Sequence, residues 1–158
     1  MRTRYLAQLP GVVVVILLIL AAGTPVSGHE HGCSPDTLEG LYVFSATGFV
    51  TPRGAAAIPK AIVELIRFDG NGSVTVPSVT LSVNGAITSL SPGAPGIYTV
   101  AELAPPDGVC VGTLTFTSGN AFNLFFPLNG ARIWMIQTNL NPNNSGNVFE
   151  GTARKIAR

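Results

Sequence analysis

Few residues in this 158-residue chain have a type and setting that suggest chemistry, and Glu64 is the first of them. It lies in an apolar run, and Ile62 and Ile66 share its face if that run is a β-strand. If this face is the interior of the fold, burial raises the pKa of the carboxyl group unless a cation such as Arg132 pairs with it. A carboxyl group of this kind is a candidate general acid or base. The alternative is an exposed Glu64 on the outer face.

The only two histidines, His29 and His31, lie close together near the N-terminus. If a leader is removed after Gly28, His31 is the third residue of a free N-terminus. The free amine, the intervening amides and the imidazole of His31 then form a square-planar nitrogen site suited to Cu(II) or Ni(II). The alternative is a solvated leader that binds no metal. No histidine is available for catalysis in the rest of the chain.

Four aromatic residues are candidates to line an apolar ligand pocket: Tyr42, Phe44, Phe126 and Trp134. The alternative is that they are ordinary core residues. Trp134 and Met135 are adjacent, so at most one of them points inward from a strand.

The two cysteines, Cys33 and Cys110, are expected to form a disulfide, because an even pair in an exported protein usually does so. The bond would close a separation of 77 residues. The chain-entropy argument gives a stabilisation of about 4.5 kcal/mol as an upper value for such a loop. The alternative, two free thiols or a metal site, has no further ligands nearby.

The N-terminus predicts export. Arg2 and Arg4 precede an apolar run, VVVVILLILAA, and small residues follow it, as in a secretory signal peptide. The run is shorter than the roughly 20 residues of a comfortable membrane span, so we expect no stable span after cleavage. The expected location is secreted or extracytoplasmic. The predicted divisions are a signal peptide over 1–28, a polar leader over 29–37 and a β-barrel domain over 38–158.

The composition argues against several classes of function. Charged residues make up only 11% of the chain and the formal net charge is +1, so there is no basic surface suited to nucleic acid. The sequence has no P-loop, no Ser/His/Asp constellation and no CxxC motif. We therefore expect no cofactor.

The remaining chain predicts an all-β fold of eight strands. No segment has a convincing helical period, and short apolar runs alternate with Gly, Pro and Asn turns. The expected strands cover 41–48, 61–68, the return strand of the hairpin with its apolar residues from Val74 to Val83, 97–103, 109–117, 121–128, 131–139 and 148–156, with loops at 51–59 and 89–96. Such a meander favours an antiparallel up-and-down barrel, with a β-sandwich as the alternative.

The hairpin over 61–85 has the clearest pattern. The sequence Asp69-Gly70-Asn71-Gly72 supplies residues that adopt the backbone conformations of a tight turn. In the return strand the apolar residues change parity at Pro77-Ser78, which predicts a β-bulge or bend.

Several strands are apolar on both faces. Exposed apolar surface of this kind marks interfaces, so we expect a homo-oligomer. The alternative is a monomer with scattered exposed apolar side chains.

The strand and turn motifs together are similar to a group of small exported bacterial β-proteins of unassigned function. These motifs are GLYVF at 40–44, FDGNG at 68–72, GIYTV at 96–100, CVGTLTF at 110–116 and GTA at 151–153. Their layout resembles that of allene oxide cyclase-like and lipocalin-like (calycin) barrels. The resemblance implies an apolar molecule held inside the barrel and frequent oligomerisation. It carries over no catalytic residue, because no catalytic motif of these families is present.

Three functions remain open. The leading hypothesis is a non-enzymatic exported barrel that binds a small apolar ligand or a protein partner. The second is a cyclase-type enzyme that holds an apolar substrate in a reactive conformation inside the barrel, with Glu64 assisting the reaction. The third is a structural protein that self-associates through its outer strands. An apolar cavity with Glu64 inside would favour the enzyme, and a filled barrel with a large subunit interface would favour the structural protein.

Overall fold

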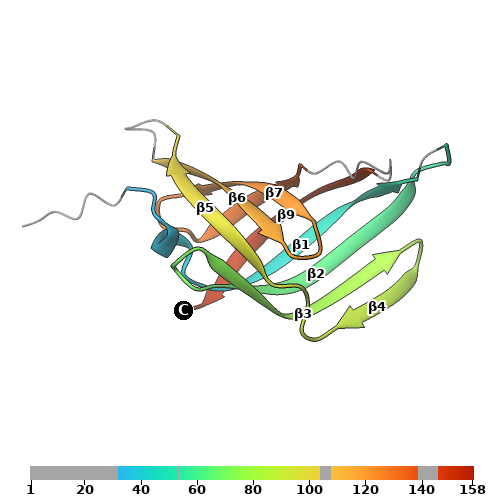
Figure 1. Ribbon diagram of the computed structural model, residues 1–158, viewed down its shortest axis with the longest axis horizontal. Coiled ribbons are helices and arrows are strands. Elements are labelled where there is room, and N and C mark those ends of the chain that lie inside the picture. The colour runs from blue at the N-terminus through green and yellow to red at the C-terminus, as the bar shows by residue number, and fades with distance from the viewer. Residues whose placement is uncertain (1–31, 53, 104–107, 139–145) are drawn as a thin grey trace, which may run out of the picture.

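The computed structural model describes residues 32–158 apart from 53, 104–107 and 139–145, and over these residues the chain is almost entirely β-structure (Figure 1). Alternating residues suit a pleated surface, and Gly and Asn close the turns between strands. The elements are the 3₁₀ turn η1 (Pro35–Leu38) and the strands β1 (Gly40–Thr51), β2 (Ile58–Phe68), β3 (Ser73–Val83), β4 (Ala86–Leu90), β5 (Gly96–Glu102), β6 (Val109–Phe116), β7 (Ala121–Pro127), β8 (Arg132–Gln137) and β9 (Gly146–Ala157).

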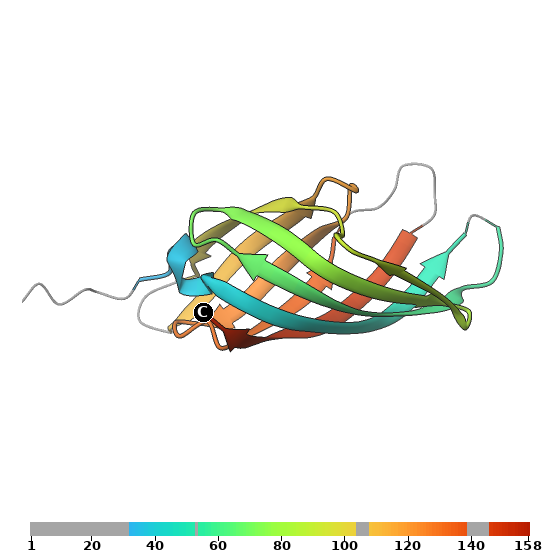
Figure 2. The same ribbon diagram turned by 90° about the horizontal axis from the view of Figure 1, so that it is seen from below.

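The strands form one closed antiparallel barrel, seen from the side in Figure 2. The order around the barrel is β1, β2, β3, β5, β6, β7, β8 and β9, and β9 returns to pair with β1. That last pairing is long, from Leu41 opposite Ala157 to Thr51 opposite Gly146. The prediction of an eight-stranded up-and-down barrel is confirmed, and the sandwich alternative is excluded because the sheet closes on itself.

The count of eight strands omits β4, which is a ninth strand outside the barrel ring. The Pro and Gly residues of 89–96 predict a loop there, but β4 pairs with the second half of β3, from Val83 opposite Ala86 to Val79 opposite Leu90. Asn84 and Gly85 have φ values of 51° and 83°, as a two-residue hairpin turn requires. All five residues of β4 are exposed, so no alternation of apolar and polar residues marks it as a strand.

The bend predicted at Pro77-Ser78 is confirmed. The register of β2 against β3 shifts so that Leu65 lies opposite Ser78 while Arg67 lies opposite Thr75. The extra residue in β3 changes which parity points inward, and Val74, Val76 and Val79 are all buried. Because β3 bends, its first residues pair with β5 and its last residues pair with β4.

The disulfide between Cys33 and Cys110 is confirmed, with 5.5 Å between the two Cα atoms. It attaches the segment before η1 to β6, and Cys110 is fully buried inside the barrel. The predicted signal peptide over 1–28 lies outside the described residues. Among the residues that are described, no helix is long and apolar enough to cross a membrane.

Candidate functional site

One end of the barrel is filled by side chains and covered by η1. Three rings stack edge to face there, with centroid distances of 5.2 Å from Tyr42 to Phe68 and 4.9 Å from Phe68 to Tyr98. The Tyr42 hydroxyl donates a hydrogen bond to the carbonyl oxygen of Gly130 at 2.7 Å, and the Tyr98 hydroxyl donates to that of Pro35 at 2.8 Å. Leu38 of η1 is fully buried. The described side chains at this end of the barrel are therefore packed as core.

The interior toward the other end contains a cavity of about 200 Å³. Its walls are mainly apolar side chains that the alternation of the strands points inward. The inward residues of the barrel strands that line it are Phe44 of β1, Lys60, Ile62 and Glu64 of β2, Val76, Val79 and Leu81 of β3, Phe116 of β6, Phe122 of β7, Gln137 of β8 and Phe149 of β9. Thr88 and Leu90 of β4, Ala94, Ser118 and Asn120 complete the lining.

Glu64 is the acidic group of this cavity. It is only 8% exposed and lies between Phe44 of β1 and Val79 of β3 in the sheet register. Burial raises the pKa of its carboxyl group to about 7, and the positive charge of Lys60 opposes this rise only in part. The carboxyl group therefore changes protonation state near neutral pH, and in its neutral form it can both donate and accept a hydrogen bond.

Lys60 lies on the inward face of β2, four residues before Glu64, and also lines the cavity. Burial lowers the pKa of its amine, while the nearby carboxylate of Glu64 acts in the opposite direction. Its Nζ atom lies 4.5 Å from the centroid of the Phe149 ring, within the range of a cation–π contact. A single acid and a single amine thus face a chamber whose other lining residues are mainly apolar, with four uncharged polar residues among them.

The predicted site residues have different positions in the structure. Phe44 lines the cavity together with Glu64. Tyr42 and Phe126 are buried inside the barrel but are not among the cavity residues. Trp134 is 49% exposed on the outer face of β8, while its neighbour Met135 points inward. Trp134 therefore does not line the interior.

Two other sequence expectations are affected by the geometry. Arg132 was considered as an ion-pair partner for a buried Glu64, but it has the outward parity of β8, the same as Trp134. The cation that acts on Glu64 is instead Lys60 of β2. The predicted metal ligands His29 and His31 lie outside the described residues, and within the described part of the chain no three His, Cys, Asp or Glu residues are grouped to hold a metal ion.

Sequence reasoning missed most of the cavity wall. Lys60 and Ile62 could have been found, because they have the same parity as Glu64 in β2. Thr88 and Leu90 could not, because β4 itself was not predicted. Phe116, Phe122 and Phe149 come from three later strands, and only the register of the closed barrel brings them to the same end.

The outer surface also has hollows. One, of about 580 Å³, runs over the outside of β9, β1 and β2 and includes Phe49, Pro59 and Val148. A second hollow of about 270 Å³ lies over β7, β8 and β9 beside Trp134. Neither contains Glu64, although Lys60 lines both the hollow of about 580 Å³ and the interior cavity.

Comparisons of the chain with protein-family models, with curated proteins and with solved structures gave no match.

Proposed function

We propose that this chain is an exported β-barrel that binds one small, mostly apolar molecule carrying a hydrogen-bonding group. The observation that carries the proposal is the cavity itself, which has apolar walls and a buried carboxyl group at Glu64. Binding sites for small molecules commonly combine apolar walls with a few polar groups that fix the orientation of the ligand.

The volume of the cavity limits the size of the ligand. An apolar cavity of about 150 Å³ in a protein is large enough to bind benzene. The cavity described here has about 200 Å³, which suits a single ring with one or two additional non-hydrogen atoms. A long fatty acid or a polycyclic sterol would need a larger chamber.

The polar group of the ligand is expected to face Glu64. Below pH 7 the neutral carboxyl group can donate a hydrogen bond to a hydroxyl or carbonyl oxygen and can accept one from a hydroxyl group. The ring of a phenol or a cyclic alcohol would contact the apolar walls, and its hydroxyl group would form a hydrogen bond with the carboxyl group of Glu64. A carboxylate ligand would instead be drawn toward Lys60.

The proposal places the protein outside the cytoplasm. The predicted signal peptide supports this location, and the Cys33–Cys110 disulfide is consistent with it because such bonds persist in oxidising compartments. The resemblance to calycin-like and allene oxide cyclase-like barrels supports the same function, since the members of those groups hold apolar molecules inside the barrel.

Native mass spectrometry of the protein purified from its own source tests this proposal. The expected result is a mature chain carrying one small organic molecule per barrel, released on unfolding. If the protein carries no such molecule, p-cresol, a ring with one methyl and one hydroxyl group, is added as a probe. An unliganded chain that p-cresol does not saturate at millimolar concentration would contradict the proposal.

A second candidate function is catalysis on the bound molecule, and the pKa of Glu64 near 7 favours it. A group with this pKa can both take up and release a proton near neutral pH, as a general acid or base must. The test follows the retained molecule by NMR in the presence of wild-type protein and of Glu64→Gln. Conversion by the wild type alone would support a cyclase-type enzyme, and an unchanged molecule in both samples would contradict it.

A further inference from the structure

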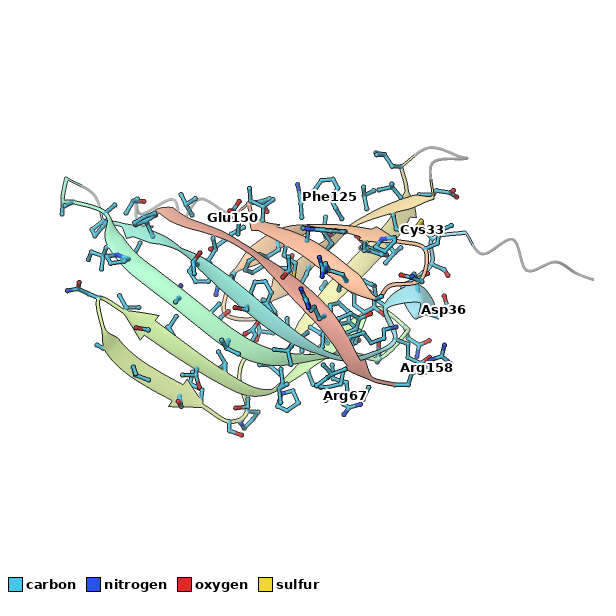
Figure 3. The ribbon with its side chains drawn as sticks, turned by 180° about the vertical axis from the view of Figure 1, so that it is seen from behind. Cys33, Asp36, Arg67, Phe125, Glu150 and Arg158 are labelled. Carbon is cyan, nitrogen blue, oxygen red and sulfur yellow. A yellow bond between two sulfur atoms is a disulfide. The ribbon has the colours of Figure 1, made fainter. Side chains whose placement is uncertain are left out.

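The outer face of β7, β8 and β9 exposes large apolar side chains that the barrel does not use. Phe125, Trp134 and Ile136 are 43%, 49% and 45% exposed. Phe125 lies opposite Trp134 in the register of β7 and β8, and Ile136 follows two residues later on the same side of β8. We name seven of the outward residues of these strands the Trp134 face: Phe125, Arg132, Trp134, Ile136, Glu150, Thr152 and Arg154. Figure 3 shows Phe125 and Glu150 on this side of the barrel.

The Trp134 face has a projection and a hollow side by side. The hollow of about 270 Å³ has Met135, Gly151 and Thr152 among its lining residues, and Trp134 stands at its border. An aromatic side chain from another molecule would fit such a hollow, since a cavity of about 150 Å³ already takes a benzene ring. A surface with both features can be complementary to a second copy of itself.

The charges of the face are arranged in the same self-complementary way. Along β9 the outward residues Glu150, Thr152 and Arg154 follow one another at equal spacing, about 7 Å apart in a strand. In the register Arg132 lies opposite Arg154, Trp134 opposite Thr152, and Ile136 opposite Glu150. The face therefore has a basic row, an aromatic row and an acidic row in order. When a second copy is turned over about an axis that runs along the aromatic row, its acidic row lies over the basic row of the first copy.

We infer that two copies of this chain bind each other through the Trp134 face, about a two-fold axis near the row of Trp134 and Thr152. In this arrangement Glu150 of each copy approaches Arg132 and Arg154 of the other. The two Trp134 side chains meet at the axis, each beside the hollow of its own copy. An interface of this kind is isologous, so the same surface serves both copies. The two sheets pack face to face, as the sheets of a sandwich do.

The charge order is the reason to choose a second copy as the occupant. In the basic row, Arg132 and Arg154 lie directly opposite each other on neighbouring strands. Like charges in such a pair destabilise an isolated sheet. A carboxylate placed over the pair relieves that repulsion. Glu150 of a second copy supplies such a group in the required position.

The first test is the oligomeric state of the full secreted protein, measured by sedimentation over a range of concentrations. Trp134 is the single tryptophan of the chain, so its emission also reports on this face alone. The expected result is a dimer that dissociates on dilution with a red shift of the emission. A monomer at 100 µM, or a trimer, would overturn the inference. So would a monomer whose emission changes only when phosphatidylcholine vesicles are added, because the face would then bind lipid.

Charge-reversal variants give a sharper test. Glu150→Arg makes the face entirely basic, and the double variant Arg132→Glu/Arg154→Glu makes it entirely acidic. We expect each to dissociate at least about tenfold more easily than the wild type, as paired interfacial charges are worth that much or more. Mixed together, the two variants should form a heterodimer.

The matched control is Ile97→Arg. Ile97 is an exposed apolar residue of β5, on the opposite side of the barrel from β9. This variant should dimerise like the wild type, and circular dichroism should confirm that all variants are folded. A dimer that Glu150→Arg leaves unchanged, or variants that fail to form a heterodimer when mixed, would overturn the inference.

Discussion

Glu64 is the one charged residue that the described part of the chain buries in its core. Burying an unpaired carboxylate is costly, and a carboxyl group in this position avoids the cost by staying protonated up to higher pH. Since Lys60 offsets the effect only partly, the pKa of Glu64 stays near 7. A side chain that does not ionise would avoid this cost altogether.

The first prediction concerns the pH dependence of stability. The pKa of Glu64 is about 7 in the folded protein against 4.5 in the unfolded chain. Between these values the folded protein binds one more proton than the unfolded chain does, so the free energy of unfolding falls as pH rises. The contribution is fully present below pH 4.5 and is lost by about pH 7. A shift of this size corresponds to about 3 kcal/mol.

Urea unfolding at pH 5 and pH 8 measures this effect. The wild type should lose stability between the two values, whereas Glu64→Gln should lose much less and should be the more stable protein at pH 8. The difference between the two proteins removes the contribution of other titrating groups. Equal pH dependence in both would show that Glu64 is not buried in this way.

The second prediction concerns Tyr42. Its hydroxyl donates to the carbonyl oxygen of Gly130 in a buried hydrogen bond of 2.7 Å. Tyr42→Phe keeps the ring but leaves that carbonyl without the donor, so the free energy of unfolding should fall by about 1–2 kcal/mol. Tyr98→Phe is a matched control because the hydrogen bond from Tyr98 to Pro35 is only partly buried. A loss from Tyr42→Phe no greater than that from Tyr98→Phe would contradict this view of the filled end.

The sequence left the orientations of both Glu64 and Trp134 open. Residues 62 and 66, which share the parity of Glu64, are apolar, but so are residues 61, 63 and 65 of the other parity, and an exposed Glu64 remained the alternative. In β8 the residues of both parities are apolar, and the pattern did not show which of Trp134 and Met135 points inward. Packing inside the closed barrel decides this, and it selects Met135.

At the scale of elements, η1 and the disulfide hold one end of the barrel shut. Gly130 has a φ of +58°, and a Cβ atom there would come within 2.1 Å of the Thr37 carbonyl oxygen, so the turn after β7 packs directly against η1. The disulfide then joins the same region to β6. The disulfide at Cys33 was predictable from the cysteine pair alone. The packing of η1 against Gly130 was not, because it joins residues far apart in the sequence and no residue pattern marks it.

The third prediction concerns this attachment. Replacing both cysteines, Cys33→Ser/Cys110→Ser, should lower the free energy of unfolding by about 2–4 kcal/mol, because the unfolded chain gains the freedom of a large loop. Denaturant unfolding without reductant measures the loss. The wild type in reductant should fall to the level of the variant. A variant as stable as the oxidised wild type would show that the bond does not constrain the chain.

The fourth prediction concerns β4, which pairs with β3 on one side only and has no buried residue. Local opening is easiest where few apolar contacts hold a strand. In hydrogen exchange we expect the amides of β4 to exchange much faster than those of β1, which pairs on both sides. Since Thr88 and Leu90 line the cavity, opening of β4 would also admit a ligand. Protection of β4 equal to that of β1 would contradict this.

At the scale of the whole molecule, closure of the barrel creates the site. The meander of hairpins was readable from the turns, because each neighbouring pair is local. The pairing of β1 with β9 joins residues more than 90 positions apart, and no local pattern distinguishes it from a sandwich. Only after this pairing do Phe44 of β1 and Phe149 of β9 face the same chamber. The fold was therefore more predictable than the cavity.

The most direct test of the central claim compares two tryptophan substitutions in β2 by NMR titration with p-cresol. Ile62→Trp should fill the cavity, while Val63→Trp places the same side chain on the exposed outer face of the same strand. We expect the wild type and Val63→Trp to bind one p-cresol per barrel with a Kd below about 1 mM, and Ile62→Trp to lose binding while remaining folded. Equal binding by Ile62→Trp, or no binding by the wild type, would contradict an interior ligand site.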